Sequence, residues 1–125
     1  MFIEHVNMTV RDPRRTADVL QRVFGWRTRW EGPSLENGRT IHVGTDTHYL
    51  ALYTHPDVPD EPHTTDHDTV GGLNHVGVVV DDLDAVERRV LAEGITTFNH
   101  ADYEPGRRFY FLDGDGVEYE VVSYT

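Results

Sequence analysis

The sequence contains no cysteine among its 125 residues. Disulfide bonds, thiolate metal sites and cysteine nucleophiles are therefore excluded, and metal binding or proton transfer must rely on histidine and carboxylate side chains. Basic residues are also scarce, because 11 lysines and arginines stand against 22 aspartates and glutamates, a formal net charge of −11. This charge repels phosphate backbones and anionic lipid, so neither nucleic acid nor a membrane surface is an expected partner.

Long apolar runs are missing as well. No stretch approaches the roughly 20 apolar residues that span a bilayer. The start of the sequence alternates polar and apolar side chains instead of forming the apolar region of a signal peptide. We therefore expect a cytoplasmic protein whose length suits one domain with an ordinary core.

What the sequence does contain is an internal repeat. Residues 3–12 and 73–82 both read as a strand with a histidine near its start, His5 in the first and His75 in the second. The two histidines are 70 positions apart. A repeat of this kind predicts two copies of one structural unit.

The segments that follow the two strands also match. Asp12 and Asp82 stand seven residues after the histidines and precede helical patterns over Pro13–Phe24 and Leu83–Ala92. An aspartate at this position is a typical N-cap, because its carboxylate accepts a hydrogen bond from a free N–H of the first turn. We predict the apolar stripe of the second helix from Val86, Val90 and Leu91.

Short strands separated by turns complete each copy. The sequence thus predicts an α+β fold of two β-α-β-β-β modules, at 1–55 and 71–125, joined by a linker into one integrated domain. The predicted strands are 26–30, 40–44 and 48–55 in the first module, with a turn at 31–38, and 95–98, 107–112 and 117–124 in the second, with a loop at 99–106.

The segment 56–70 differs from both modules because it is rich in proline and acidic residues and almost free of apolar ones. It reads as a solvated linker. His63 and His67 are four residues apart, a spacing that would chelate a metal on a helix, but Pro62 and the acidic surroundings favour a loop.

The last predicted strand places charge on one face. Tyr119 and Val121 alternate with Glu118 and Glu120, so the glutamates lie opposite the face that packs on a helix. Charge on an inward face is costly unless it is paired or bound to a cation. We therefore predict that His5, His75 and Glu120 converge and bind one divalent metal ion per chain, such as Fe(II), Mn(II), Zn(II) or Ni(II).

The two strands His-Val-Asn-Met-Thr-Val and His-Val-Gly-Val-Val-Val, each followed by a capped helix, resemble the vicinal oxygen chelate superfamily. This group contains glyoxalase I, extradiol dioxygenases, fosfomycin-modifying thiol transferases and bleomycin-resistance proteins. The closing segment 109–120 resembles the family pattern Phe-Tyr-Phe-x-Asp-Pro-Asp-Gly-x-x-x-Glu, with Gly114 in place of the proline.

The resemblance implies a half-barrel cup, pairing of two chains into a homodimer, and a divalent ion held by residues on the first, fourth, fifth and eighth strands. The matching positions here are His5, Ala51, His75 and Glu120. Ala51 cannot bind a metal. Since the glyoxalase I pattern has a glutamate at that position, isomerase activity of that type is not expected, and lyase or dioxygenase-type chemistry is.

Candidates for contact with a substrate follow from the same resemblance. Tyr110 and Arg108 share one face of their strand and are candidate catalytic residues. The alternative for the tyrosines is a structural role in the core. Candidate proton-transfer residues are His42, His48 and His55, and candidate substrate-binding residues are Asn7, Tyr49, Ala51, Tyr53 and Tyr110.

Together these features predict a metal-dependent enzyme that acts on a small substrate through vicinal oxygens. The alternative is a metal-free dimer of the bleomycin-resistance type that binds a drug or another small molecule.

Overall fold

The computed structural model describes residues 1–63 and 67–125. Residues 64–66, which belong to the predicted linker 56–70, lie outside the described residues. The chain divides into two compact units, Met1–Asp60 and Glu61–Thr125.

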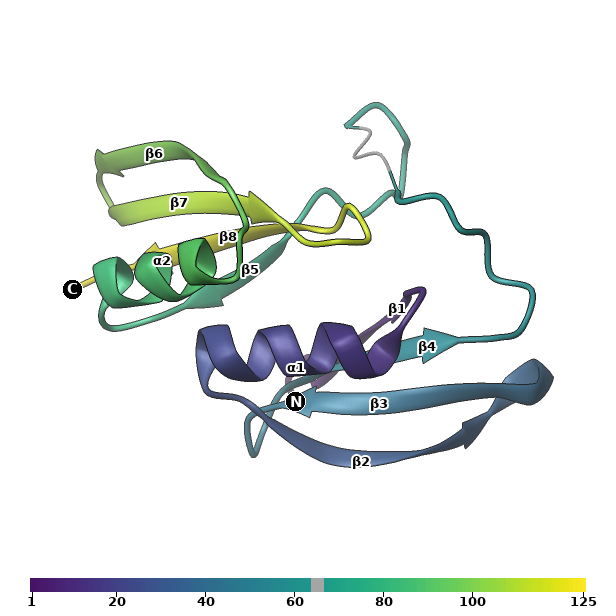
Figure 1. Cartoon of the computed structure of the whole chain (residues 1–125). Helices are drawn as coiled ribbons and strands as arrows, with labels where there is room; N and C mark the ends of the chain where they lie inside the picture. The colour runs from purple at the N-terminus through teal and green to yellow at the C-terminus, as the bar shows by residue number, and fades with distance from the viewer. Residues whose placement is uncertain (64–66) are drawn as a thin grey trace. The chain divides into compact units, whose positions relative to one another are not determined.

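The first unit is a four-stranded sheet with one helix packed on it (Figure 1). Its strands follow the order β1-β4-β3-β2, in which β1 and β4 run parallel and the other pairs run antiparallel. The elements are β1 (His5–Thr9), α1 (Pro13–Phe24), β2 (Arg27–Ser34), a 3-10 turn (Leu35–Asn37), β3 (Gly38–Gly44) and β4 (Tyr49–Thr54).

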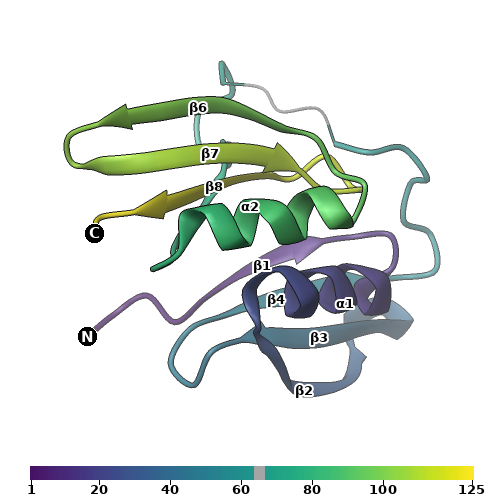
Figure 2. The same ribbon diagram turned by 60° about the vertical axis from the view of Figure 1, so that its left-hand side comes forward.

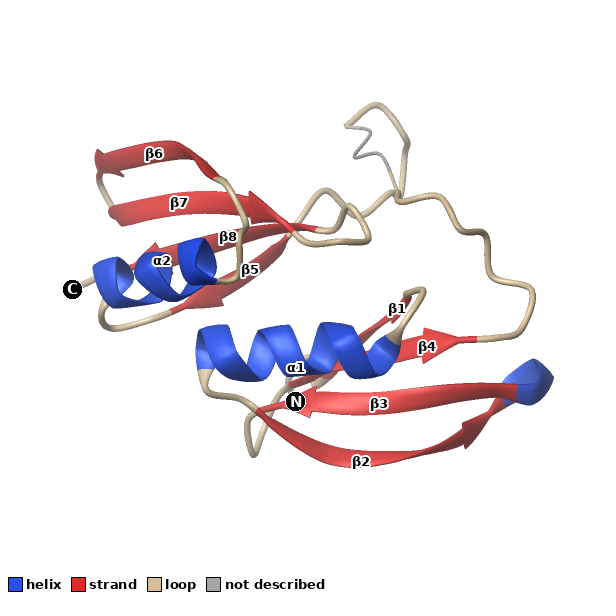
Figure 3. Ribbon diagram, in the orientation of Figure 1, coloured by secondary structure: helices blue, strands red, loops and turns tan. Residues whose placement is uncertain are grey.

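The second unit has the same topology, with strand order β5-β8-β7-β6 and a parallel β5–β8 pair (Figure 3). The predicted α+β fold of two β-α-β-β-β modules is therefore confirmed. The elements are β5 (Val76–Val79), α2 (Leu83–Ala92), β6 (Thr97–Tyr103), β7 (Gly106–Leu112) and β8 (Glu118–Ser123).

Both helices begin where the sequence predicts. The Asp12 carboxylate accepts a hydrogen bond from the backbone N–H of Arg15, and Asp82 does the same for Ala85. Gly25 ends α1 with φ 73°, a left-handed conformation that costs glycine little.

Each helix covers one face of its own sheet (Figure 2). α2 uses Leu83, Val86 and Val90 for this contact. Leu91, which we expected in the apolar stripe, is 52% exposed and lies off the packed face. We call the other face of each sheet, the one opposite its helix, the open face. The fully enclosed side chains of the second unit include Phe109, Phe111, Tyr119 and Val121.

β2 is longer than predicted. The expected turn 31–38 is wrong over its first half, because Glu31, Gly32 and Pro33 continue to pair with β3. β2 is an edge strand, so Pro33 can lie in it without removing a hydrogen bond from the interior of the sheet.

β6 also extends into a predicted loop, 99–106. A bulge between Phe98 and Ala101 interrupts its pairing with β7, and Asn99 within the bulge has φ 52°. Asparagine tolerates this left-handed conformation better than most residues. The polar residues that suggest a loop are instead those of a bulged edge strand.

The turn between β7 and β8 contains two Asp-Gly steps, Asp113-Gly114 and Asp115-Gly116, and glycine is the residue that most readily supplies positive φ in a turn. Only Gly116 does so, with φ 81°. A Cβ atom there would lie 1.9 Å from the carbonyl oxygen of His63, so the position requires glycine for space as well.

In the part of the chain that the structure describes, neither helix has the length and apolar character needed to cross a bilayer.

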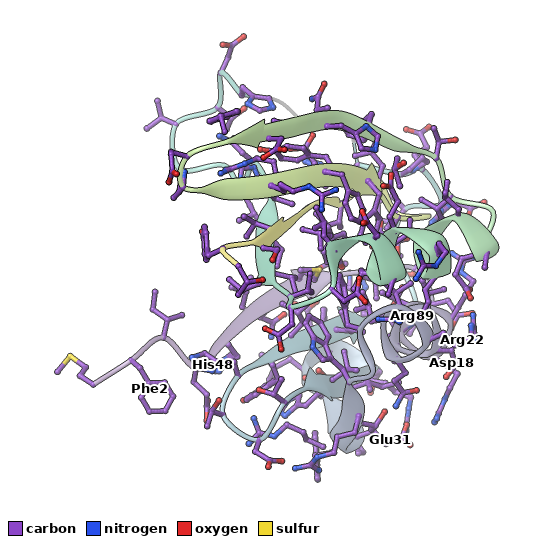
Figure 4. All side chains as sticks on the ribbon, turned by 90° about the vertical axis from the view of Figure 1, so that its left-hand side faces the viewer. Phe2, Asp18, Arg22, Glu31, His48 and Arg89 are labelled. Carbon is purple, nitrogen blue, oxygen red and sulfur yellow. The ribbon has the colours of Figure 1, made fainter. Side chains whose placement is uncertain are left out.

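We predict that Phe109→Ala lowers the free energy of unfolding by about 3–5 kcal/mol, because Phe109 is fully buried and its loss leaves a cavity. Urea denaturation followed by circular dichroism measures this change. The matched control is Phe2→Ala, because Phe2 is 66% exposed and its ring contacts the His48 ring at 5.4 Å (Figure 4). An equal effect of the two substitutions would contradict the packing described for β7.

Candidate functional site

The last strand separates apolar from charged side chains as predicted. Tyr119 and Val121 on β8 are fully buried, whereas Glu118 and Glu120 lie on the open face and keep partial exposure. Strand alternation therefore presents two carboxylates away from α2.

His75, immediately before β5, lies between these two carboxylates. Its Nε2 atom is 2.9 Å from Oε2 of Glu120, and its Nδ1 atom is 3.5 Å from Oε2 of Glu118. A carboxylate near Nδ1 is the usual partner of a histidine that binds a metal through Nε2.

His5 has the same kind of neighbour in the first unit. Its Nδ1 atom is 2.9 Å from Oε1 of Glu4, which also accepts a hydrogen bond from the Tyr49 hydroxyl at 3.3 Å. The bond with His5 is the main cause that lowers the pKa of Glu4, and the smaller effect of Tyr49 adds to it. Both repeat histidines therefore have Nδ1 against a glutamate.

Arg108 and Tyr110 surround Glu120. The Arg108 guanidinium donates from Nη1 to Oε1 of Glu120 at 2.9 Å, so the two carboxylate oxygens have different partners. The Tyr110 ring meets the His75 ring edge-on at 5.7 Å. Burial, followed by the negative charge of Glu120, raises the pKa of Tyr110, so its hydroxyl stays protonated and can donate.

Two of the three predicted metal ligands are thus brought together in the second unit, and the third, His5, belongs to the first unit. Among the described residues of either unit taken by itself, no three histidine or carboxylate side chains are placed to hold a metal ion. A shared site of His5, His75 and Glu120 stays a prediction.

The donors in the second unit fit a metal. The 2.9 Å between His75 Nε2 and Glu120 Oε2 is close to the spacing of neighbouring ligands around an ion with bonds of about 2.1 Å. Ligating carboxylates are themselves usually hydrogen-bonded, as Glu120 is by Arg108. The positive charge of Arg108 acts in the opposite direction and weakens the attraction for a cation.

Of the three candidate proton-transfer histidines, one lies on the open face of the first sheet. His42 pairs across the strands with Ala51, and its ring stacks on Tyr49 at 4.5 Å. His48 lies in the exposed turn before β4, where Nδ1 is 2.8 Å from the Thr47 hydroxyl. His55 lies beyond the end of β4.

The predicted substrate-binding residues of the first unit share the open face. Asn7 is exposed and pairs with Ala51, which is 2% exposed. Tyr49 and Tyr53 lie on either side of Ala51 along β4, and both hydroxyls have acceptors within the unit: Glu4 for Tyr49 and the Leu35 carbonyl, at 2.9 Å, for Tyr53.

Sequence reasoning gives no site role to four residues beside these positions. Glu4 and Glu118 orient the two repeat histidines, and both are readable from the sequence as carboxylates one or two positions from a candidate ligand. Trp30 and Arg29 lie next to His42 and Tyr49, with the Trp30 and His42 rings 5.2 Å apart and the Arg29 guanidinium 4.7 Å from the Tyr49 ring centre. The sequence predicts a strand that ends at Trp30, and composition alone does not indicate that Trp30 pairs with His42.

A further histidine–glutamate pair lies away from the predicted site. His100 Nε2 is 2.5 Å from Oε2 of Glu87, which also accepts a hydrogen bond from the Thr97 hydroxyl. This pair connects α2 to β6, beside a cavity of about 260 Å³ that neither His75 nor Glu120 lines. Variants of His100 and Glu87 therefore serve as controls for variants of the histidine–glutamate pairs at the proposed site.

We predict that His42 titrates below pH 6.5. Burial is the main cause that lowers the pKa of His42, and the positive charges of His5 and Arg29 add to it. The folded state therefore disfavours protonated His42, and the cost appears as pH falls below 6.5. Imidazole resonances followed by NMR against pH measure the midpoint.

The matched variant for this titration is Arg29→Gln, which removes one of the positive charges and is expected to raise the midpoint of His42. A midpoint at or above 6.5 in the unmodified protein would contradict the described environment of His42.

Comparisons with known proteins agree with this architecture. The family model described as "Glyoxalase/Bleomycin resistance protein/Dioxygenase superfamily" matches residues 2–121. A search of curated proteins finds no match.

Several solved structures share the fold. A glyoxylase/bleomycin resistance protein/dioxygenase domain from Frankia sp. EAN1pec is 20% identical, with a TM-score of 0.84 over 98% of this chain and 97% of that one. A glyoxalase family protein from Enterococcus faecalis is 20% identical, with a TM-score of 0.76 over 97% and 96%. The fosfomycin resistance protein FosX from Listeria monocytogenes, complexed with Mn(II) and sulfate, is 16% identical, with a TM-score of 0.73 over 99% and 93%.

Proposed function

The chain belongs to the glyoxalase/bleomycin resistance protein/dioxygenase superfamily, and from this premise we propose that it is a metal-dependent enzyme acting on a small substrate through vicinal oxygens. His5, His75 and Glu120 are the proposed ligands of one divalent ion. Fe(II), Mn(II), Zn(II) and Ni(II) all suit two imidazoles and one carboxylate. The FosX structure with Mn(II) is a precedent in the same fold for such an ion.

The observation that carries the proposal is the matched orientation of the two repeat histidines. Glu4 lies against Nδ1 of His5, and Glu118 lies near Nδ1 of His75. A histidine that binds a metal through one nitrogen usually donates its other N–H to a carboxylate, a carbonyl or water. The same arrangement occurs at two histidines 70 positions apart. It supports the binding of one metal ion by both Nε2 atoms.

Each remaining side chain has a distinct role in this proposal. Arg108 holds one oxygen of Glu120 and leaves the other for the ion. A divalent ion bound there supplies Lewis acidity to a pair of substrate oxygens. Tyr110, kept protonated by burial and by Glu120, donates a hydrogen bond to a substrate oxygen that gains negative charge. Because Ala51 stands where a fourth protein ligand would be, a bound ion would keep coordination positions for substrate, and this favours lyase or dioxygenase-type chemistry.

We predict about one divalent ion per chain in the purified protein and its loss in His75→Ala, because removal of one of three ligands leaves a weak site. Elemental analysis after dialysis measures the content. His100→Ala is the control, since His100 also contacts a glutamate but lies outside the proposed site. Unmodified protein that neither contains nor takes up a divalent ion would refute the proposal.

The glutamates beside the histidines provide a second test. We predict that Glu4→Gln and Glu118→Gln each weaken binding of Mn(II) about tenfold, the effect usual for residues that orient metal-bound histidines. Calorimetric titration of metal-free protein measures the affinity. Glu87→Gln, which alters the pair with His100, is expected to leave the affinity unchanged. A loss of affinity in Glu87→Gln as large as in the other two would indicate general destabilisation instead.

A metal-free dimer that binds a drug or another small molecule is the second candidate function. The bond between Arg108 and Glu120 favours it, because the guanidinium already neutralises the carboxylate without an ion. The metal measurements separate the two candidates, since this function requires no ion.

A further inference from the structure

The open face of the first sheet carries a continuous row of planar side chains. The Trp30 and His42 rings are 5.2 Å apart, and the His42 and Tyr49 rings are 4.5 Å apart. The His5 ring then stacks on Tyr49 at 4.8 Å with 15° between the planes. The four rings come from four different strands or their ends and lie side by side through the strand register.

Trp30 extends this row toward solvent. A Cβ atom at Gly32 would lie 2.7 Å from Cζ2 and 2.8 Å from Cη2 of Trp30, so the benzo ring of the indole occupies the space above Gly32. Trp30 is nevertheless 50% exposed. The sequence Trp-x-Gly thus holds a large ring close to β2 while part of that ring stays open to a ligand.

Arg29 adds a positive charge, and no carboxylate among the described residues is bonded to it. The guanidinium lies 4.7 Å from the Tyr49 ring centre, and its Nη1 atom is buried with no acceptor among the described residues. The charge of Arg29 contributes to lowering the pKa of Glu4, but the Glu4 carboxylate already accepts hydrogen bonds from His5 and Tyr49. A buried donor without an acceptor is costly, and an anion bound beside it would relieve this cost.

We propose that this surface, formed by Arg29, Trp30, His42 and Tyr49, binds a planar aromatic ring that carries a negatively charged oxygen group. The ring of the ligand stacks on the exposed indole and its neighbours, where flat groups gain most contact. The charged oxygens accept hydrogen bonds from Arg29, which prefers carboxylate-like acceptors. This inference rests on the proposed function, because it assumes that the substrate binds at the open face of the first sheet. It adds the chemical class of that substrate.

Three probes separate the contribution of ring stacking from that of the negative charge. Benzoate is planar and anionic, cyclohexanecarboxylate is anionic without a flat ring, and benzamide is flat without charge. We expect benzoate to bind about tenfold more tightly than either of the others, because only benzoate uses both the stacking surface and the charge-assisted hydrogen bonds. NMR titration of the full chain, with the Trp30 indole N–H and the His42 ring as reporters, measures the affinities.

Two variants with matched controls assign the effect to residues. Gly32→Ala is expected to displace the indole and weaken benzoate binding several-fold, whereas Gly77→Ala, where an added Cβ meets no atom within 4 Å, is expected to have no effect. Arg29→Gln is expected to remove the preference for benzoate over benzamide. Its control is Arg27→Gln, because Arg27 is exposed and paired with Asp46 at 2.6 Å. Trp30→Ala replaces Gly32→Ala if the latter does not fold.

These titrations test the proposed binding surface independently of metal binding, because they are made in the presence of a chelator. Benzoate that leaves the Trp30 and His42 resonances unchanged, or that binds no better than cyclohexanecarboxylate, would overturn the stacking surface. Equal binding of benzoate and benzamide would overturn the role of Arg29. Failure of the metal predictions with success of these titrations would reject the enzyme and retain the binding surface.

Discussion

The alternation of side chains along β8 is the constraint on which the second unit depends. Tyr119 and Val121 fill the space beneath α2, and this fixes Glu120 on the opposite face beside Arg108 and His75. A shift of one residue in the register would bury a glutamate under the helix and expose an apolar core residue. Core packing and site geometry are therefore set by the same hydrogen-bonded ladder.

The repeat and the helices could be predicted from the sequence because their signals are local. Pro13–Phe24 and Leu83–Ala92 match the predicted bounds, since an aspartate cap and helical periodicity mark each one. The sequence predicts β2 and β6 too short, because glycine, proline and asparagine in an edge strand give the same composition as a loop. Strand parity also predicts that Glu120 faces away from the helix.

The partners of the site residues were not predictable in the same way. Arg108 bonds one oxygen of Glu120 through neighbouring strands, and this choice depends on rotamers and register that composition does not encode. The contacts of Glu4 with both His5 and Tyr49 depend likewise on the parallel pairing of β1 with β4. Sequence reasoning located the candidate ligands, while the side chains that orient them required three-dimensional contacts.

The two modules differ in the side chain at the centre of their fourth strand. Ala51 pairs with Asn7 at the position where Glu120 pairs with Gly77, so the register is shared but the chemistry differs. The first sheet, without a carboxylate in its centre, has room for a row of rings, whereas the second concentrates opposite charges. The backbone of the two units is thus repeated while the side chains on their open faces differ, so each open face would select its own class of ligand.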